Sequence, residues 1–550
     1  MKKIIKNVFF VALSAFALGA CKAEQETALV GPVASGGLDF SNYVAVGNSL
    51  TAGFADNGLY LEGQQNSYPQ FLNDQFAKVG GNPVFNQPFF AAANSDGSGY
   101  LKVTGYSATN RPVISPFGLD TLPVAIPAGS FAFSAPTASL PANPYILGFN
   151  RGARQLIPYA GSATANQNLG IPGLAVVHVT NKAYSLQNPF FDRLLTSVQR
   201  GNGTPIPANG ITYLSYISSL AKKPSFFTCW LGNNDVLGYA TGGGDDFAAI
   251  GNGGITPSGL FNPSYDALVN SLTTNDAKGV LATIPDVTAL PYFTTVKETD
   301  LQSIVFSDGK LEVKIAGAVV STTNFPGLPP VGPFFPGVGS VPTAAQVASF
   351  FNALYLANGY TDPGFAPGAN GPAIIVNVPT GTRSPLNPTQ VKRLSAADGD
   401  FIVLPFSSVA TALITGGGGF MSPPTIANPA GSPNPFADRW FLDASEVTKV
   451  KAATAGFNAK IKAVAATKGL ALFDAAATFN EIIANNGIDD VVGNTAFISG
   501  TLFSLDGVHL TPKGYGTIAN QFIKAINAHY NSSIPLLDIR QRGLRGVRLP

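Results

Sequence analysis

Residues 43–53 read Tyr-Val-Ala-Val-Gly-Asn-Ser-Leu-Thr-Ala-Gly, a short apolar run closed by a glycine and a polar turn. Continuous apolar runs that end in turn residues are typical of strands buried on both faces of a parallel sheet. The same pattern recurs at residues 226–230, 279–284, 401–404 and 470–473. Together with residues 43–46, these segments predict five strands of a parallel sheet.

The C-terminal part of the chain carries two helix patterns. One apolar stripe ends just before Gly469, a residue type favoured just past helix C-termini. The other follows Thr511-Pro512, the order expected for an N-cap and a first helical residue. The stripes comprise Val447, Val450, Thr454, Phe457, Ile461 and Val464, and then Tyr515, Ile518, Ala519, Phe522, Ile523 and Ile526. Helices alternating with buried strands predict an α/β fold, a three-layer α/β/α sandwich.

The composition excludes several classes of protein. The chain has 550 residues, of which 45% are hydrophobic and 12% charged, so it can bury a sizeable core and is not disordered. Its 33 Lys and Arg against 31 Asp and Glu give no basic footprint for nucleic acid. Two cysteines cannot form a disulfide framework or a cysteine-only zinc site.

The N-terminus has the pattern of an export signal. Residues 1–20 combine three lysines with an apolar stretch at 8–20 that is too short to span a bilayer. The stretch ends in Leu-Gly-Ala-Cys, which resembles the bacterial lipobox and implies lipidation of Cys21. An ordinary signal peptide with an incidental cysteine is the alternative. A lysine rather than an aspartate follows Cys21, which favours an outer-membrane lipoprotein of the cell envelope, periplasmic or surface facing.

The rest of the chain divides by composition. Residues 21–38 are expected to form a tether and residues 39–530 the main domain. Two long Gly-, Pro- and Phe-rich segments, at about 87–167 and 292–400, are predicted to be packed insertions. Residues 531–550 carry four arginines and are expected to form a solvated basic tail, with membrane-surface contact as the alternative.

Only three histidines could serve as a general base, and His509 has the most suitable surroundings. Asp506 lies three residues earlier in a loop and could accept the ring N–H of His509, which would fix its tautomer. His178 lies between valines and is expected to be structural. His529 is expected at a helix end, where a charged imidazole is favourable. Cys229 lies in an apolar run and is expected to be a buried core thiol.

The candidate nucleophile is Ser49, which follows the first predicted strand at the edge where open α/β sheets bind ligands. Asn234 follows the second predicted strand, and its amide could donate to an oxyanion, while Asp235 could hold that loop. Gly173, in a loop bracketed by glycines, could supply a backbone donor. Gly242–Asp246 lacks the ligand spacing of a calcium loop and is expected to be a turn, and Gly416–Gly419 lacks the Lys-Ser/Thr of a phosphate-binding loop.

Four blocks follow one another along the chain: Ser49, the Gly173 loop, Asn234-Asp235, and Asp506 with His509. In this order they resemble the SGNH (GDSL) esterase/lipase superfamily. The resemblance implies a flavodoxin-like core without metal or organic cofactor, with Ser49 as nucleophile, His509 as base and Asp506 as orienting acid. It also implies an oxyanion hole formed by the backbone of Ser49 and of Gly173 and by the side chain of Asn234. Asn48 stands where the family usually has an aspartate, and the two insertions have no assured counterpart.

The expected activity is hydrolysis of a carboxylic ester through an acyl-enzyme. The substrate would be a lipid or an acylated small molecule or glycan, and the lipid anchor would hold the enzyme at a membrane. Two alternatives remain open: a carbohydrate acetylesterase, or a non-catalytic lipoprotein that binds glycan or lipid on a degenerate hydrolase scaffold. The sequence leaves the oligomeric state open.

Overall fold

The computed structural model describes most of the chain after the N-terminal segment. The export signal, Cys21 and most of the predicted tether lie outside the described residues, as do parts of both predicted insertions. The described ranges are 33–107, 112–118, 121–123, 154–182, 184–195, 211–244, 254–315, 317–324, 341–377, 388–422 and 431–550. Within these ranges no helix is long and apolar enough to cross a membrane.

The described chain is built on a five-stranded parallel sheet in the order β19-β8-β7-β1-β6. The first strand in the sequence therefore lies between the second and the third, so the direction of the connections reverses between β1 and β7. Open α/β sheets bind ligands at such a switch point, beyond the carboxyl ends of the strands. The strands are β1 Tyr43–Gly47, β6 Asn168–Gly170, β7 Phe226–Trp230, β8 Lys278–Ala282 and β19 Ala471–Phe473.

Four of the five predicted strands are confirmed, and the one at 401–404 is wrong. There, β15 (Phe401–Ile402) pairs antiparallel with β18 (Phe441–Leu442), away from the parallel sheet. The run is apolar because Ile402, Val403 and Leu404 are buried, but burial alone does not say which element they pack against. The missing strand is β6, which has only three residues and was predicted as a loop.

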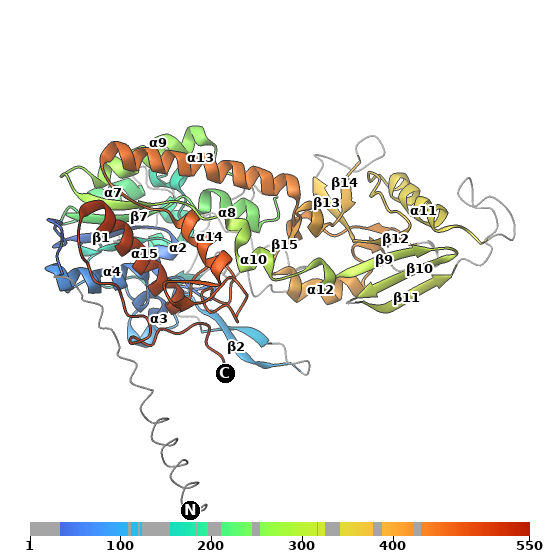
Figure 1. Ribbon diagram of the computed structural model, residues 1–550, viewed down its shortest axis with the longest axis horizontal. Coiled ribbons are helices and arrows are strands. Elements are labelled where there is room, and N and C mark those ends of the chain that lie inside the picture. The colour runs from blue at the N-terminus through green and yellow to red at the C-terminus, as the bar shows by residue number, and fades with distance from the viewer. Residues whose placement is uncertain are drawn as a thin grey trace, which may run out of the picture.

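Helices cover both faces of the sheet, as the α/β prediction requires (Figure 1). On one face lie α7 (Tyr213–Ser218), α9 (Ser258–Leu272) and α13 (Ala444–Lys468). On the other lie α4 (Tyr68–Phe76) and α15 (Pro512–Tyr530). Both predicted helices are confirmed, and their predicted apolar stripes are buried.

The predicted helix ends are also confirmed. Gly469 follows α13 in the left-handed conformation with a φ of 61°, and the side chain of Thr511 accepts a hydrogen bond from the Gly514 N–H to cap α15.

Other described helices are α2 Ser49–Ala52, α3 Leu61–Gln65, α5 Tyr184–Gln187, α6 Pro189–Asp192, α8 Asn234–Thr241, α10 Pro291–Thr294, α12 Phe406–Thr415 and α14 Ala475–Asn485.

A second lobe stands beside the sheet domain, between α10 and α13 (Figure 1). Its four-stranded antiparallel sheet packs against α11 (Ala344–Ala357) around a separate core that includes Phe306, Phe351 and Phe420. The lobe takes up most of the predicted 292–400 insertion and continues to β18. Its strands are β9 Gln302–Ser307, β10 Lys310–Ile315, β11 Ala318–Asn324 and β12 Gly368–Asn370, with the smaller pairs β13 Ala373–Asn377 with β14 Gln390–Arg393 and β16 Phe420–Met421 with β17 Pro433–Asn434.

The described part of the first predicted insertion includes two antiparallel strand pairs. Strand β2 (Tyr100–Tyr106) pairs with β3 (Pro112–Phe117), and its Leu101 and Val103 pack against Leu505. A second antiparallel pair joins β4 (Thr121–Pro123) to β5 (Arg154–Leu156). Near the end of the chain, β20 (Gly487–Ile488) pairs with β21 (Val491–Val492).

The predicted basic tail is solvated only in part, because Arg540, Arg542 and Arg548 are exposed but its apolar residues pack on the domain. Ile534, Leu537 and Ile539 are buried in the core of the sheet domain. Arg542 lies 2.6 Å from the carboxylate of Asp74, and Arg545 pairs with Glu62. The apolar side chains that anchor the tail are spaced among polar residues, so its composition indicated a solvated segment while its packing is that of a domain element.

Candidate active site

Ser49 is the first residue of α2, directly after β1. The Asn48 side chain caps this helix by accepting a hydrogen bond of 3.1 Å from the Leu50 N–H, so asparagine does here what a capping aspartate could do. Gly47 allows the close approach of β7, because a Cβ at this position would lie 2.6 Å from the Trp230 carbonyl oxygen. The sharp turn between β1 and α2 therefore depends on Gly47, the last residue of β1, and on Asn48, which follows it.

Ser49, His509 and Asp506 form a hydrogen-bonded relay. The Nε2 atom of His509 lies 2.7 Å from Ser49 Oγ, and its Nδ1 lies 2.8 Å from Asp506 Oδ2. An ionised carboxylate can only accept, so Nδ1 carries the proton and Nε2 is the acceptor that faces the serine hydroxyl. The structure thus brings together three residues separated by up to 460 positions.

Asp506 is held as an anion despite its burial. Burial alone would raise the pKa of the Asp506 carboxyl, but the charge of His509 and the hydrogen bonds from His509 and Val508 lower it to about 2. The Val508 and His509 backbone N–H groups donate to Oδ1 at 2.8 Å, and the Asn57 N–H donates to Oδ2 at 2.8 Å. This carboxylate can therefore orient His509 and stabilise an imidazolium across the working pH range.

The two predicted oxyanion loops follow β6 and β7, the two strands that flank β1 in the sheet. Gly173 follows β6 in the left-handed region with a φ of 81°, and Asn234 begins α8 after β7. The Asn234 amide donates to the Leu174 carbonyl at 3.0 Å, and a carboxamide carries a second N–H that can donate. The Gly173 loop is held close to Ser49, because the Ile171 N–H donates to the Gly47 carbonyl at 3.1 Å.

The sequence suggested that Asp235 holds its own loop, and the structure shows its carboxylate bonded to the turn that follows the Gly173 loop. Its carboxylate accepts the Val176 N–H at 2.8 Å and lies 3.4 Å from the Val177 N–H, at the start of the 3₁₀ turn Val176–Thr180. Burial raises the pKa of this carboxyl to about 6, although the backbone donors oppose the shift. The loops that carry Asn234 and Gly173 are therefore joined both by this buried carboxylate and by the Asn234 amide.

Sequence analysis missed the turn Ala55–Gly58, which contacts the acid of the relay. Ala55 and Gly58 exchange backbone hydrogen bonds of 3.0 and 2.9 Å, and Asn57 supplies the donor to Asp506 described above. An Asn-Gly pair is the usual signal for this tight turn, so the dipeptide at 57–58 could have located it. Phe54 was also missed, and its ring centroid lies 4.6 Å from that of His509.

The other reactive residue types lie apart from the relay. Burial lowers the pKa of His178 to about 4, and its ring stacks on Tyr184 at 4.5 Å. His529 lies at the end of α15, 3.2 Å from the Gly469 carbonyl. Cys229 is fully buried, and burial raises the pKa of its thiol to about 12, which confirms a core thiol.

The glycine-rich motifs end helices. Gly242 follows α8, and the last two residues of the predicted turn, 245–246, lie outside the described chain. Gly416 follows α12. Among the residues that the structure describes, no cluster of three or more His, Cys, Asp or Glu side chains could hold a metal ion.

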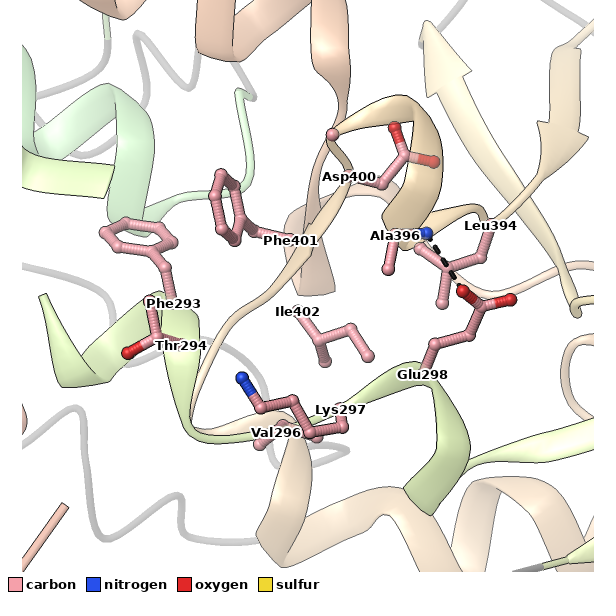
Figure 2. Close-up of a pocket in the computed structure, with 11 residues that line it drawn as sticks. Phe293, Thr294, Val296, Lys297, Glu298, Leu394, Ala396, Asp400, Phe401 and Ile402 are labelled. Atoms are coloured by element: carbon pink, nitrogen blue, oxygen red, sulfur yellow. Dashed lines mark hydrogen bonds between the residues drawn. The ribbon is translucent and has the colours of Figure 1, made fainter. Parts of the chain in front are cut away.

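The chain passes between the sheet domain and the second lobe at residues 293–298 and 394–402, which we call the neck. A cavity of about 140 Å³ lies there, and no residue of the relay lines it (Figure 2). Phe293, Phe401 and Ile402 form its apolar wall, and Glu298 accepts the Ala396 N–H at 2.9 Å across one side. The neck reaches the relay by another route. The Tyr292 N–H donates to the Gly507 carbonyl, between Asp506 and His509, at 3.0 Å.

Comparison with family models, with curated proteins and with solved structures finds no match to this chain. The functional assignment therefore rests on the geometry of the site.

Proposed function

We propose that this protein is a serine hydrolase of the SGNH (GDSL) superfamily with a flavodoxin-like core, and that it cleaves carboxylic esters. The single observation that carries the proposal is the relay from Ser49 through His509 to Asp506, with contacts of 2.7 and 2.8 Å, at the switch point of a parallel sheet. A surface serine and histidine in chance contact would not need a buried, ionised carboxylate behind the ring.

In the proposed reaction, His509 Nε2 takes the hydroxyl proton as Ser49 Oγ bonds to the ester carbonyl carbon. The carbonyl oxygen becomes an oxyanion that the Ser49 and Gly173 N–H groups and the Asn234 amide stabilise. The imidazolium then protonates the departing alkoxide and leaves an acyl-enzyme. Water, deprotonated by His509, attacks the acyl carbon, and the imidazolium then returns the proton to Ser49 Oγ as its bond to the acyl carbon breaks and the carboxylic acid leaves.

The test is turnover of p-nitrophenyl esters of increasing acyl length, with Ser49→Ala as the inactive variant. Ser219→Ala is the matched control, because Ser219 lies at the end of α7 and its hydroxyl donates only to the Tyr216 carbonyl at 2.8 Å. A fluorophosphonate probe should label Ser49 in the wild type and in the control. Equal turnover by Ser49→Ala and the wild type would remove Ser49 from the mechanism.

The chain-length series also separates the substrate classes. A preference for acetyl over longer chains would favour the carbohydrate acetylesterase, and a preference for long chains would favour a lipid ester. No turnover with any ester, together with retained glycan or lipid binding, would favour the non-catalytic scaffold.

We further propose that the enzyme is a lipoprotein of the cell envelope, anchored through Cys21. The support is the pattern of the first 21 residues alone, since they lie outside the described structure. Metabolic labelling with a fatty-acid analogue tests the anchor. Label on the wild type that disappears in Cys21→Ser is the expected result, and label retained by the variant would contradict it.

A further inference from the structure

We propose that Asp56 and Asn57 are positioning residues for the proposed esterase, and that the turn Ala55–Gly58 clamps the loop that carries Asp506. This inference rests on the proposed function, because it assigns a role toward the orienting acid of that reaction. Neither residue touches the reacting atoms. They act through Asp506 and His509.

Three hydrogen bonds join the turn to the loop Ser504–Asp506, and a fourth lies within the loop. The Asp56 N–H donates to Ser504 Oγ at 2.9 Å, and the Ser504 hydroxyl donates to Asp506 Oδ1 at 3.2 Å. The Asn57 N–H donates to Asp506 Oδ2 at 2.8 Å, and the Leu505 N–H donates to Asp56 Oδ1 at 3.0 Å. Every residue from 504 to 506 is therefore bonded to the turn, so the acid cannot shift unless the turn shifts too.

The turn can make these bonds only in an uncommon backbone conformation. Asp56 and Asn57 have φ angles of 51° and 59°, in the left-handed region that aspartate and asparagine tolerate and β-branched residues avoid. The segment at 99–101, where β2 begins, fixes the conformation of the turn further. A Cβ on Gly58 would collide with the Gly99 carbonyl, and the Leu101 N–H donates to the Asp56 carbonyl at 2.6 Å.

The same short segment also carries the proposed nucleophile, Ser49, five residues before Phe54. The Phe54 N–H donates to the Ser49 carbonyl at 3.0 Å, and the Tyr515 hydroxyl donates to the Phe54 carbonyl at 2.6 Å. The Phe54 ring lies against the His509 ring. Residues 49–58 therefore include Ser49 and contact both Asp506 and His509. Because the turn belongs to the same segment as the serine, the clamp sets the distance between the serine and the histidine.

Asp56 adds a charge as well as a hydrogen-bond acceptor. Burial raises the pKa of its carboxyl to about 6, and the neighbouring Asp506 anion adds to that effect, while the Leu505 N–H and the Tyr60 hydroxyl oppose it. Above about pH 6 a second negative charge thus lies close to the relay. The titratable groups that face Asp56 are Asp506, Tyr60, Tyr100, Tyr515 and Arg545, the last of which pairs with Glu62.

The test compares Asp56→Ala with Asp56→Asn in the full chain, using p-nitrophenyl ester hydrolysis. Asp56→Ala leaves the Leu505 N–H without its acceptor, and we expect kcat to fall about 10- to 100-fold with KM within about threefold. Asp56→Asn keeps that acceptor and should recover most of kcat above pH 7. It lacks the charge that favours an imidazolium, so the acidic limb of kcat/KM should move to lower pH by about half a unit.

Asp443→Ala is the matched control. Asp443 is also a buried aspartate that accepts backbone N–H groups, at 2.6 and 3.2 Å, but it caps α13 and does not contact the relay. Its kcat and its pH profile should stay at wild-type values.

A second pair of variants keeps the test decisive if Asp56→Ala does not fold. Asn57→Gly retains the left-handed conformation and should keep kcat within about threefold, whereas Asn57→Val disfavours it and should lower kcat at least about tenfold. Wild-type kcat in Asp56→Ala, a superimposable pH profile in Asp56→Asn, or equal kcat in the two Asn57 variants would overturn the clamp. Those results with an inactive Ser49→Ala leave the proposed function standing, while an active Ser49→Ala refutes the function itself.

Discussion

Asp235 gives the sharpest prediction, because one buried carboxylate ties together both proposed oxyanion loops. Replacing it with asparagine keeps an oxygen for the Val176 N–H and removes the charge. Raising the pKa of this carboxyl from its ordinary value of 3.8 to about 6 costs about 3 kcal/mol of folding stability at pH 7. Asparagine does not incur that cost. The stability of Asp235→Asn relative to the wild type should therefore be higher at pH 7 than at pH 4.

The sign follows from proton binding. Between pH 3.8 and about 6 the folded protein holds a proton on Asp235 that the unfolded chain has lost, so wild-type stability falls as the pH rises through this window. Asp56 titrates in the same direction and contributes to the wild-type curve. The difference between the wild type and Asp235→Asn removes that shared contribution and should change by about 2 kcal/mol between pH 4 and pH 7.

Urea unfolding at several pH values measures this difference. In a Trp440→Phe background the remaining tryptophan, Trp230, is fully buried in β7 and reports on the parallel sheet. Asp235→Ala is the companion variant, and it should lower kcat about 100-fold, because the Asn234 and Gly173 donors lose their common anchor. Parallel stability curves for wild type and Asp235→Asn, or wild-type kcat in Asp235→Ala, would refute the reasoning.

Three further predictions concern the framework. Gly47→Ala should destabilise the protein by about 2–4 kcal/mol, measured as a fall in Tm, and should also lower activity, because the new Cβ overlaps the neighbouring strand and α2. In a Cys21→Ser background, Cys229 should not react with DTNB at pH 8 until urea unfolds the chain, because burial raises the pKa of its thiol to about 12; reaction of the native protein would contradict its burial. Phe457→Ala should cost about 3–5 kcal/mol in urea unfolding, because its buried ring stacks on Phe261 at 3.9 Å, and a loss below about 1 kcal/mol would show that the site collapses without a cavity.

Much of the fold could be predicted from the sequence because its main elements carry strong local signals. Strands buried on both faces must be apolar throughout, and long helices that pack on a sheet show a stripe of buried residues and a cap at each end. The relay could be predicted for a different reason. Asp506 lies within reach of His509 in one loop, and Ser49 follows a strand whose end faces the ligand edge of such a sheet.

The errors came from segments whose environment is set by distant residues. Strand β6 has three residues and a single large apolar side chain, Leu169, so no periodicity could mark it. The run at 401–404 is buried at the neck and has the composition of a sheet strand. The tail after Tyr530 is held by apolar contacts and ion pairs with partners hundreds of residues away, which its own sequence does not contain.

The position of the second lobe follows from where it enters the fold. It is inserted between β8 and α13, in a connection that leaves the carboxyl end of a strand, and Ser49 and Asn234 follow the carboxyl ends of β1 and β7. Parallel strands place all these ends at one edge of the sheet, so the lobe must stand on the same side as the relay. The Tyr292–Gly507 hydrogen bond is the local result: it joins the neck of the lobe to the loop between acid and base.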